Sequence, residues 1–214
     1  MIKIVRRDTE KSRRAMIELE RFLRRGTGEC STQAIMDALE ECFYGKCYLC
    51  ENKMITSYEV EHLRPHRGRA ELKYDWNNLF LSCRHCNNIK GENFTNILDC
   101  TKYAVDELIA FRETSDMEII VEALSNDASV IETVDLLRKC YDGNTPQKKM
   151  EAKTIKRHLH KELLEFKDLL MLKESNNEQE VNDAILAIER ETGESSAFTS
   201  FKRWILKDEA LYNI

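Results

Sequence analysis

The stretch CYLCENKMITSYEVEHLRPH, residues 47–66, decides which fold this sequence can form. It begins with a Cys-x-x-Cys pair, and a second pair with the same spacing follows at Cys83 and Cys86. Two thiolates two residues apart can bind one tetrahedral ion, and two such pairs complete a closed four-cysteine shell. We therefore expect Cys47, Cys50, Cys83 and Cys86 to bind a structural Zn²⁺; the alternative is four reduced cysteines in the core.

The composition is that of a soluble globular protein, because 33% of the 214 residues are charged and 42% are hydrophobic. There is no apolar run near the ~18 residues that span a bilayer and no evident signal peptide, so we expect a cytoplasmic protein without a membrane partner. Reducing compartments disfavour disulfides, so the eight cysteines favour metal binding. The net charge of −5 is only a weak argument against nucleic acid, because the acidic excess lies mostly in residues 101–214.

Apolar periodicity divides the chain into an N-terminal helical segment, a core with the cysteine pairs, and a mainly helical C-terminal region, at residues 1–44, 45–100 and 101–214. Helical spacing predicts helices over 9–25, 31–43, 101–112, 128–140 and from Thr145 onward. In the core we expect strands near 57–62 and 79–82 and a short helix from Cys83, whereas 118–124 is ambiguous and fits a strand. The expected fold class is therefore α+β and mostly helical. The amphipathic, acidic C-terminal region suits docking of a partner; the alternative is an ordinary helical core.

The insert between the cysteine pairs contains the polar residues of a second site. Glu61 and His62 end the first expected strand, and Asn87 directly follows the last cysteine. A neutral histidine can take a proton near pH 7, and carboxylate and amide oxygens are ligands that Mg²⁺ or Mn²⁺ prefers. Because consecutive strand residues point to opposite faces, Glu61 and His62 can share one site only if the strand bends or ends there. Arg64-Pro65 favours such an ending.

The combination of the two cysteine pairs with EH, NNL and CNxxK over residues 47–91 resembles the HNH endonucleases, which have a ββα-metal core. The resemblance implies a phosphodiester hydrolase in which His62 is the general base and Glu61 and Asn87 bind a catalytic Mg²⁺ or Mn²⁺. It gives Asn78 the role of bracing the loop that aims His62; the alternative is a plain turn cap. Candidate contacts to substrate phosphate are Arg64, His66, Arg67 and Lys90.

The segments GKCYLCE, EVEHLRPH, DWNNLFLSCRHCNNIKG and ILDC are also similar to the PtuB family, the HNH subunits of Septu-type anti-phage defence systems, with related proteins beside some retrons. This similarity implies a nuclease effector that acts on nucleic acid together with a PtuA-like ATPase. His66 departs from the Lys or Arg expected after the proline, which weakens a phosphate role there. We expect DNA as the substrate. The alternatives are an RNA (tRNA) nuclease of a retron-type system and a non-catalytic zinc-knuckle adaptor, although an adaptor has no reason to carry Glu61-His62 together with Asn87.

Overall fold

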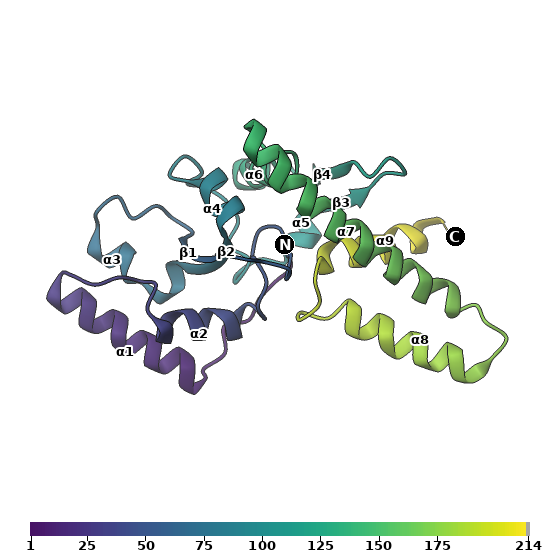
Figure 1. The fold of residues 1–214 in the computed structure, drawn as a ribbon, viewed down its shortest axis with the longest axis horizontal. Helices are drawn as coiled ribbons and strands as arrows, with labels where there is room; N and C mark the ends of the chain where they lie inside the picture. The colour runs from purple at the N-terminus through teal and green to yellow at the C-terminus, as the bar shows by residue number, and fades with distance from the viewer. Residues whose placement is uncertain (213–214) are drawn as a thin grey trace.

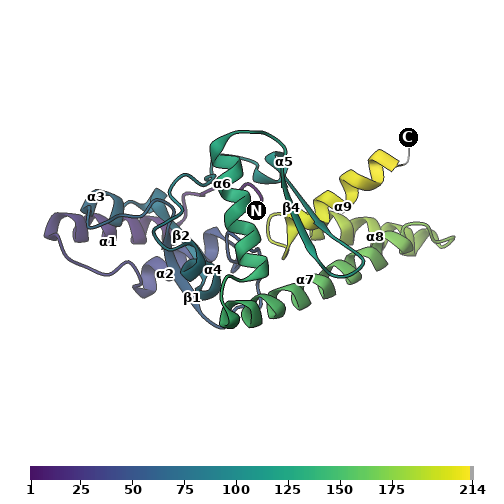
Figure 2. The ribbon, with the colours of Figure 1, turned by 90° about the horizontal axis from the view of Figure 1, so that it is seen from above.

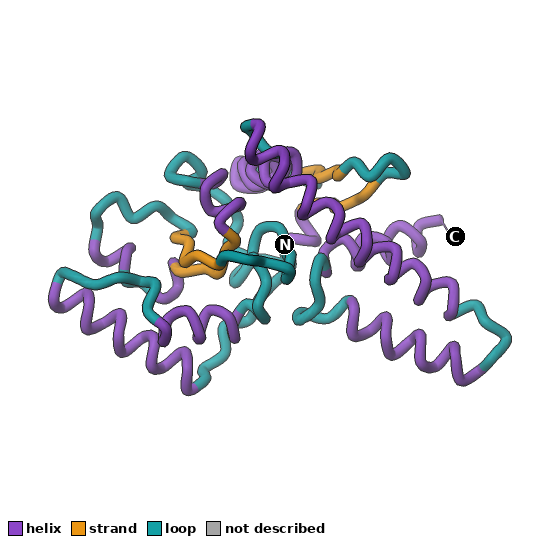
Figure 3. Tube along the Cα trace, viewed as in Figure 1, coloured by secondary structure: helices purple, strands orange, loops and turns teal. Residues whose placement is uncertain are grey.

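The computed structural model describes residues 1–212, in which helices surround two small antiparallel sheets (Figures 1 and 3). The N-terminal segment forms α1 (Glu10–Arg25) and α2 (Gln33–Cys42), which pack against each other. Thr9 and Ser12 form a capping box at the start of α1, and Gly26 ends the helix with a φ of 68°. Thr32 caps α2 by accepting a hydrogen bond from the Ile35 amide. Both predicted helices are confirmed.

The expected ββα core is also confirmed. Strand β1 (Tyr58–His62) pairs antiparallel with β2 (Leu79–Cys83), which places Glu61 opposite Phe80 and His62 opposite Leu79. Helix α4 (Arg84–Lys90) begins directly after β2 and packs on both strands. The connection between the strands contains α3 (Ala70–Lys73) and the 3₁₀ helix η1 (Trp76–Asn78).

The C-terminal region differs from the expectation in one place. The predicted helix 101–112 is wrong, because only α5 (Val105–Leu108) is helical and β3 (Ile109–Glu113) follows at once. Strand β3 pairs with β4 (Ile119–Ala123), which confirms the strand reading of the ambiguous segment. The apolar residues of 105–111 fit both the helical and the strand periodicity. Pairing with β4 therefore decides that residues 109–113 form a strand.

The remaining elements are helices, as expected. They are α6 (Ala128–Asp142), α7 (Pro146–Leu172), α8 (Glu178–Glu191) and α9 (Thr199–Tyr212). Thr145 caps α7 and Pro146 occupies its first turn. Helix α7 begins beside α4 and extends away from the ββα core toward α8 (Figure 2). In residues 1–212, no helix is both long and apolar enough to cross a membrane.

One hydrophobic core joins all three sequence regions. The rings of Phe43, Tyr48 and Phe80 contact one another between α2, β2 and the turn at residues 47–50, called the first cysteine turn below. On the other side of this turn, Tyr141 of α6 packs on Phe201 of α9 with ring centroids 5.6 Å apart. The ββα core is therefore packed between the N-terminal helices and the C-terminal region, whose last two residues lie outside the described part of the chain.

Candidate functional site

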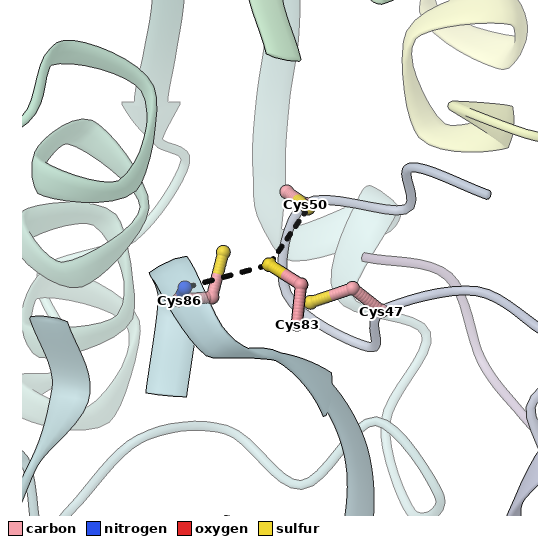
Figure 4. A group of neighbouring side chains, drawn as sticks. All are labelled: Cys47, Cys50, Cys83 and Cys86. Carbon is pink, nitrogen blue, oxygen red and sulfur yellow. Dashed lines mark hydrogen bonds between the residues drawn. The ribbon is translucent and has the colours of Figure 1, made fainter. Parts of the chain in front are cut away.

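The four cysteines of the two Cys-x-x-Cys pairs converge in the interior (Figure 4). Their sulfur atoms all lie within 4.8 Å of one another, and all four side chains are buried. Cys47 and Cys50 lie on the turn before β1, where the Glu51 amide donates to the Cys47 carbonyl at 2.8 Å. Cys83 ends β2, and Cys86 lies in the first turn of α4.

This cluster fits a structural zinc. With Zn–S bonds of about 2.3 Å, the sulfurs of a tetrahedral site lie about 3.8 Å apart; those of Cys50 and Cys83 are 4.0 Å apart. Four buried thiolates also leave no position for water or substrate, which is characteristic of structural rather than catalytic zinc. Bound zinc would cross-link the first cysteine turn to the junction of β2 and α4.

Two residues around the cluster have roles that the sequence did not indicate. Cys140 of α6 is fully buried and lies beside the cluster. His85 lies between the cysteines of the second pair, a position that favours a solvent-exposed side chain. The side chain is nevertheless only 7% exposed. Its ring nitrogens contact the Glu151 carboxylate of α7 and the Cys140 carbonyl, each at 2.8 Å. Single cysteine and histidine residues carry no spacing signal, so these contacts emerge only from the fold.

One face of β1 and α4 presents the predicted oxygen ligands. Glu61 is 5% exposed, and Lys90 donates to its Oε1 at 2.7 Å, which leaves Oε2 without a hydrogen-bond partner in residues 1–212. The side-chain nitrogen of Asn87 donates to Glu59, so its Oδ1 likewise has no partner among the described residues. Two free oxygens on adjacent elements are a donor set that suits a hydrated Mg²⁺ or Mn²⁺ ion.

The two carboxylates on this face have different ionisation properties. Burial raises the pKa of Glu61 to about 7 and outweighs the opposite effect of Lys90. Burial also opposes the ionisation of Glu59, but hydrogen bonds from Arg84 and Asn87 and the charges of Arg84 and Lys148 lower the pKa of that group. Sequence reasoning missed Glu59, although strand alternation in YEVEH puts it on the same face as Glu61.

His62 is the last residue of β1, where it pairs with Leu79. Its Nε2 lies 3.0 Å from the main-chain carbonyl of Lys73. A carbonyl only accepts, so Nε2 carries the hydrogen in the neutral ring and Nδ1 is left with a lone pair. Burial lowers the pKa of His62 below 6.5, which keeps the ring neutral near pH 7. In the described part of the chain no hydrogen bond links the His62 ring to Glu61 or Asn87.

Asn78 ties the loop after β1 to the start of β2. Its Oδ1 accepts from the Arg64 amide at 2.8 Å, and its Nδ2 donates to the carbonyls of Arg64 and Leu72, both at 2.9 Å. Leu72 is next to Lys73, the residue whose carbonyl orients His62. The contacts support a bracing role for Asn78, which remains a prediction for catalysis.

The four candidate phosphate contacts fall into two groups. Arg64 and Arg67 are exposed on the loop after β1, where each donates to a main-chain carbonyl, and His66 is half-buried with its ring centroid 4.8 Å from that of His62. Lys90 is fully buried and donates to Glu61 and to the His62 carbonyl. The expectation that Lys90 contacts substrate therefore needs correction: its ammonium joins α4 to the end of β1 and is not accessible to a phosphate.

Comparison with known proteins agrees with this arrangement. Residues 47–93 match the family described as HNH endonuclease. The chain is also 34% identical over 77 residues to the Septu protein PtuB of Bacillus mycoides (strain KBAB4). That match covers 29% of this chain and 26% of the relative, so the chain matches only about a quarter of the length of that protein. Residues 47–93 therefore match an HNH endonuclease domain, and part of the chain is similar to PtuB.

Proposed function

We propose that this protein is a metal-dependent endonuclease that hydrolyses phosphodiester bonds, with DNA as its substrate. The observation that carries the proposal is the orientation of His62, whose Nε2 is bound by the Lys73 carbonyl so that Nδ1 keeps its lone pair. A general base needs a fixed nitrogen that is neutral at the working pH, and His62 meets both requirements.

The chemistry can be divided among few residues. His62 takes the proton of an attacking water at Nδ1, while the Lys73 carbonyl keeps the ring from rotating. Glu61 and Asn87 offer the oxygens for the catalytic ion. A bound Mg²⁺ or Mn²⁺ would polarise the phosphoryl group and stabilise the leaving oxygen. Exposed Arg64 and Arg67 can contact the phosphates on either side of the scissile bond.

We further propose that the nuclease is the effector of a Septu-type defence system and acts with a PtuA-like ATPase. The support is its similarity to a protein named Septu protein PtuB. Residues 101–214 lie outside the HNH domain, and their acidic excess and amphipathic helices suit the docking of such a partner.

The proposal is tested by the cleavage of plasmid DNA and of tRNA in Mg²⁺ or Mn²⁺, by the protein alone and with the ATPase. We expect His62→Ala to lower the DNA cleavage rate by about 10²–10⁴-fold, because this is the usual contribution of a general base. The matched control is His158→Gln, which changes a half-buried histidine of α7 outside the ββα core.

Circular dichroism and zinc content should be the same for His62→Ala and the wild type. Equal cleavage by both proteins would exclude His62 as the base. Cleavage of tRNA but not of plasmid, lost in His62→Ala, would assign the same chemistry to RNA.

A further inference from the structure

The first half of α7 is basic although the region that contains it is acidic. Residues 146–161 include six lysines or arginines and one glutamate, whereas residues 101–214 carry 16 basic and 23 acidic residues. Charge in the C-terminal region is therefore segregated rather than mixed. Helix α8 shows the opposite bias, with five acidic residues and one arginine over Glu178–Glu191.

Four of the basic residues of α7 recur at every fourth position on its outer side. This basic stripe consists of Lys149, Lys153, Arg157 and Lys161, all exposed. The buried residues of α7 lie on the other side of the helix, and Arg157 points about 160° away from buried Leu159. The stripe therefore lies opposite the side of α7 that packs in the core.

The stripe is not neutralised by the protein. Lys149, Lys153 and Arg157 have no ion pair or side-chain hydrogen bond with any residue of 1–212, and Lys161 has a single exposed contact with Glu165 at 3.5 Å. Like charges four residues apart destabilise a helix. In α1, by contrast, Arg14 and Arg24 each pair with a glutamate four residues earlier. Unpaired cations in this arrangement indicate an external anionic partner.

The stripe begins beside the HNH domain. Lys148, adjacent to Lys149, is close enough to act electrostatically on Glu59 of β1, and Glu151 of the same turn contacts His85 of α4. From there α7 extends away from the ββα core (Figure 2). The stripe spans about 18 Å along the helix, roughly the length of five base pairs.

We infer that the basic stripe of α7 binds the phosphodiester backbone of the nucleic acid next to the cleavage site. The inference rests on the proposed nuclease function and assigns the C-terminal region a part in substrate binding. Four lysine or arginine side chains at helical spacing match a linear polyanion and make no base-specific contacts, so the stripe adds affinity without sequence preference.

The test is a combined variant with Lys149→Gln, Lys153→Gln and Arg157→Gln. Binding is measured by fluorescence anisotropy to a DNA duplex and to a single-stranded RNA of about 30 nucleotides, in a His62→Ala background that leaves the probes uncut. Each phosphate contact contributes about 0.9 to the salt dependence of duplex binding and about 0.7 to that of a single strand. We expect the slope of log K against log salt to fall by about 2.7 for DNA or about 2 for RNA, with at least tenfold weaker binding near physiological salt.

The matched control replaces Lys3, Lys11 and Arg25 by glutamine, which removes the same charge from exposed side chains that are equally unpaired in residues 1–212. The control should keep the wild-type slope. An unchanged slope in the α7 variant, or an equal loss in the control, would overturn the inference. Unchanged nucleic-acid binding with weaker binding of poly-L-glutamate would assign the stripe to an acidic protein instead. These readouts do not depend on cleavage, so they stand apart from the test of His62.

Discussion

A single main-chain oxygen orients the residue on which the chemistry depends. The Lys73 carbonyl accepts from Nε2 of His62, and the neighbouring Leu72 carbonyl accepts from Asn78. The side chain of Asn78 therefore fixes Leu72, and the carbonyl of the next residue, Lys73, orients the His62 ring. Replacing Asn78 would remove the partner of the Arg64 amide and of the Arg64 and Leu72 carbonyls, all of them partly buried.

Glu61 makes the binding of the catalytic ion depend on pH. Burial raises its pKa to about 7, so below that pH a proton competes with the ion for the carboxylate. We expect the affinity for Mn²⁺ to fall about tenfold between pH 8 and pH 6, because the ionised fraction falls by that factor. Mn²⁺ titration followed by electron paramagnetic resonance measures this.

The matched comparison is Glu61→Gln, which should bind Mn²⁺ weakly and with no change across the same pH range. An affinity of the wild type that does not vary with pH would show that Glu61 is not the ligand. His62 is present in both proteins, so any titration of its ring affects the wild type and Glu61→Gln alike.

These residues show what sequence alone could predict at a site. The resemblance to HNH endonucleases predicts Glu61, His62, Asn78 and Asn87 as site residues, and the end of β1 at His62 follows from Arg64-Pro65. The Lys73 carbonyl could not be predicted, since a main-chain oxygen has no side-chain identity. The burial of Lys90 could not be predicted either, because helical spacing puts it on the face of Asn87 without saying whether that face is covered.

The cysteine cluster connects the first cysteine turn to the junction of β2 and α4. The first cysteine turn contacts β2 through a hydrogen bond from the Tyr48 amide to the Leu81 carbonyl, and α4 is only seven residues long. A helix of that length is marginal without tertiary support. The cluster at its first turn therefore fixes the position of Asn87, one residue after Cys86.

We expect the Cys47→Ser protein to bind no zinc, and its ββα core no longer to show a cooperative unfolding transition. The reason is that structural zinc supplies about 10–16 kcal/mol of binding free energy to comparable small sites. Cys42→Ser, a half-buried cysteine outside the cluster, is the control and should keep both. Zinc content by atomic absorption and thermal unfolding by circular dichroism test this. A folded, metal-free Cys47→Ser protein would show that the cysteines are only core residues.

Helices with caps were predictable as elements, whereas β3 was not. Thr9, Thr32 and Thr145 mark helix starts through local chemistry that is visible in the sequence. Strand β3 depends on its pairing with β4 and on the packing of Phe111 against Phe201, with ring centroids 5.3 Å apart. Phe201 lies 90 positions after Phe111 in the chain, so no local sequence pattern predicts their contact.

Buried polar contacts join the C-terminal region to the first cysteine turn. Tyr141 donates to the Cys50 carbonyl, and the Ser200 amide and hydroxyl donate to the Glu51 carboxylate at 2.9 and 2.6 Å. Glu51 also accepts from the Ile2 amide at 2.9 Å. One carboxylate thus links the start of the chain, the first cysteine turn and α9, and it is 1% exposed.

Glu51 predicts how the stability of the molecule depends on pH. Burial opposes its ionisation, but the Met1 amino group, Lys46 and the Ser200 hydrogen bonds outweigh burial and lower its pKa from 4.5 to about 2. A lowered folded-state pKa stabilises the protein above pH 4.5, and the contribution is lost as the pH falls through about 2. Its full size is on the order of 3 kcal/mol.

We therefore expect Glu51→Gln to lower the free energy of unfolding by about 3 kcal/mol at pH 7 and by roughly three quarters of that at pH 4. Urea unfolding of both proteins in excess zinc at each pH measures the difference, because the added zinc opposes the loss of metal from the cysteine cluster in acid. Glu174→Gln, an exposed carboxylate after α7, is the control and should change stability little at either pH. A difference that stays constant between pH 7 and pH 4 would mean that Glu51 stabilises through packing, and that its charge does not hold α9 against the first cysteine turn.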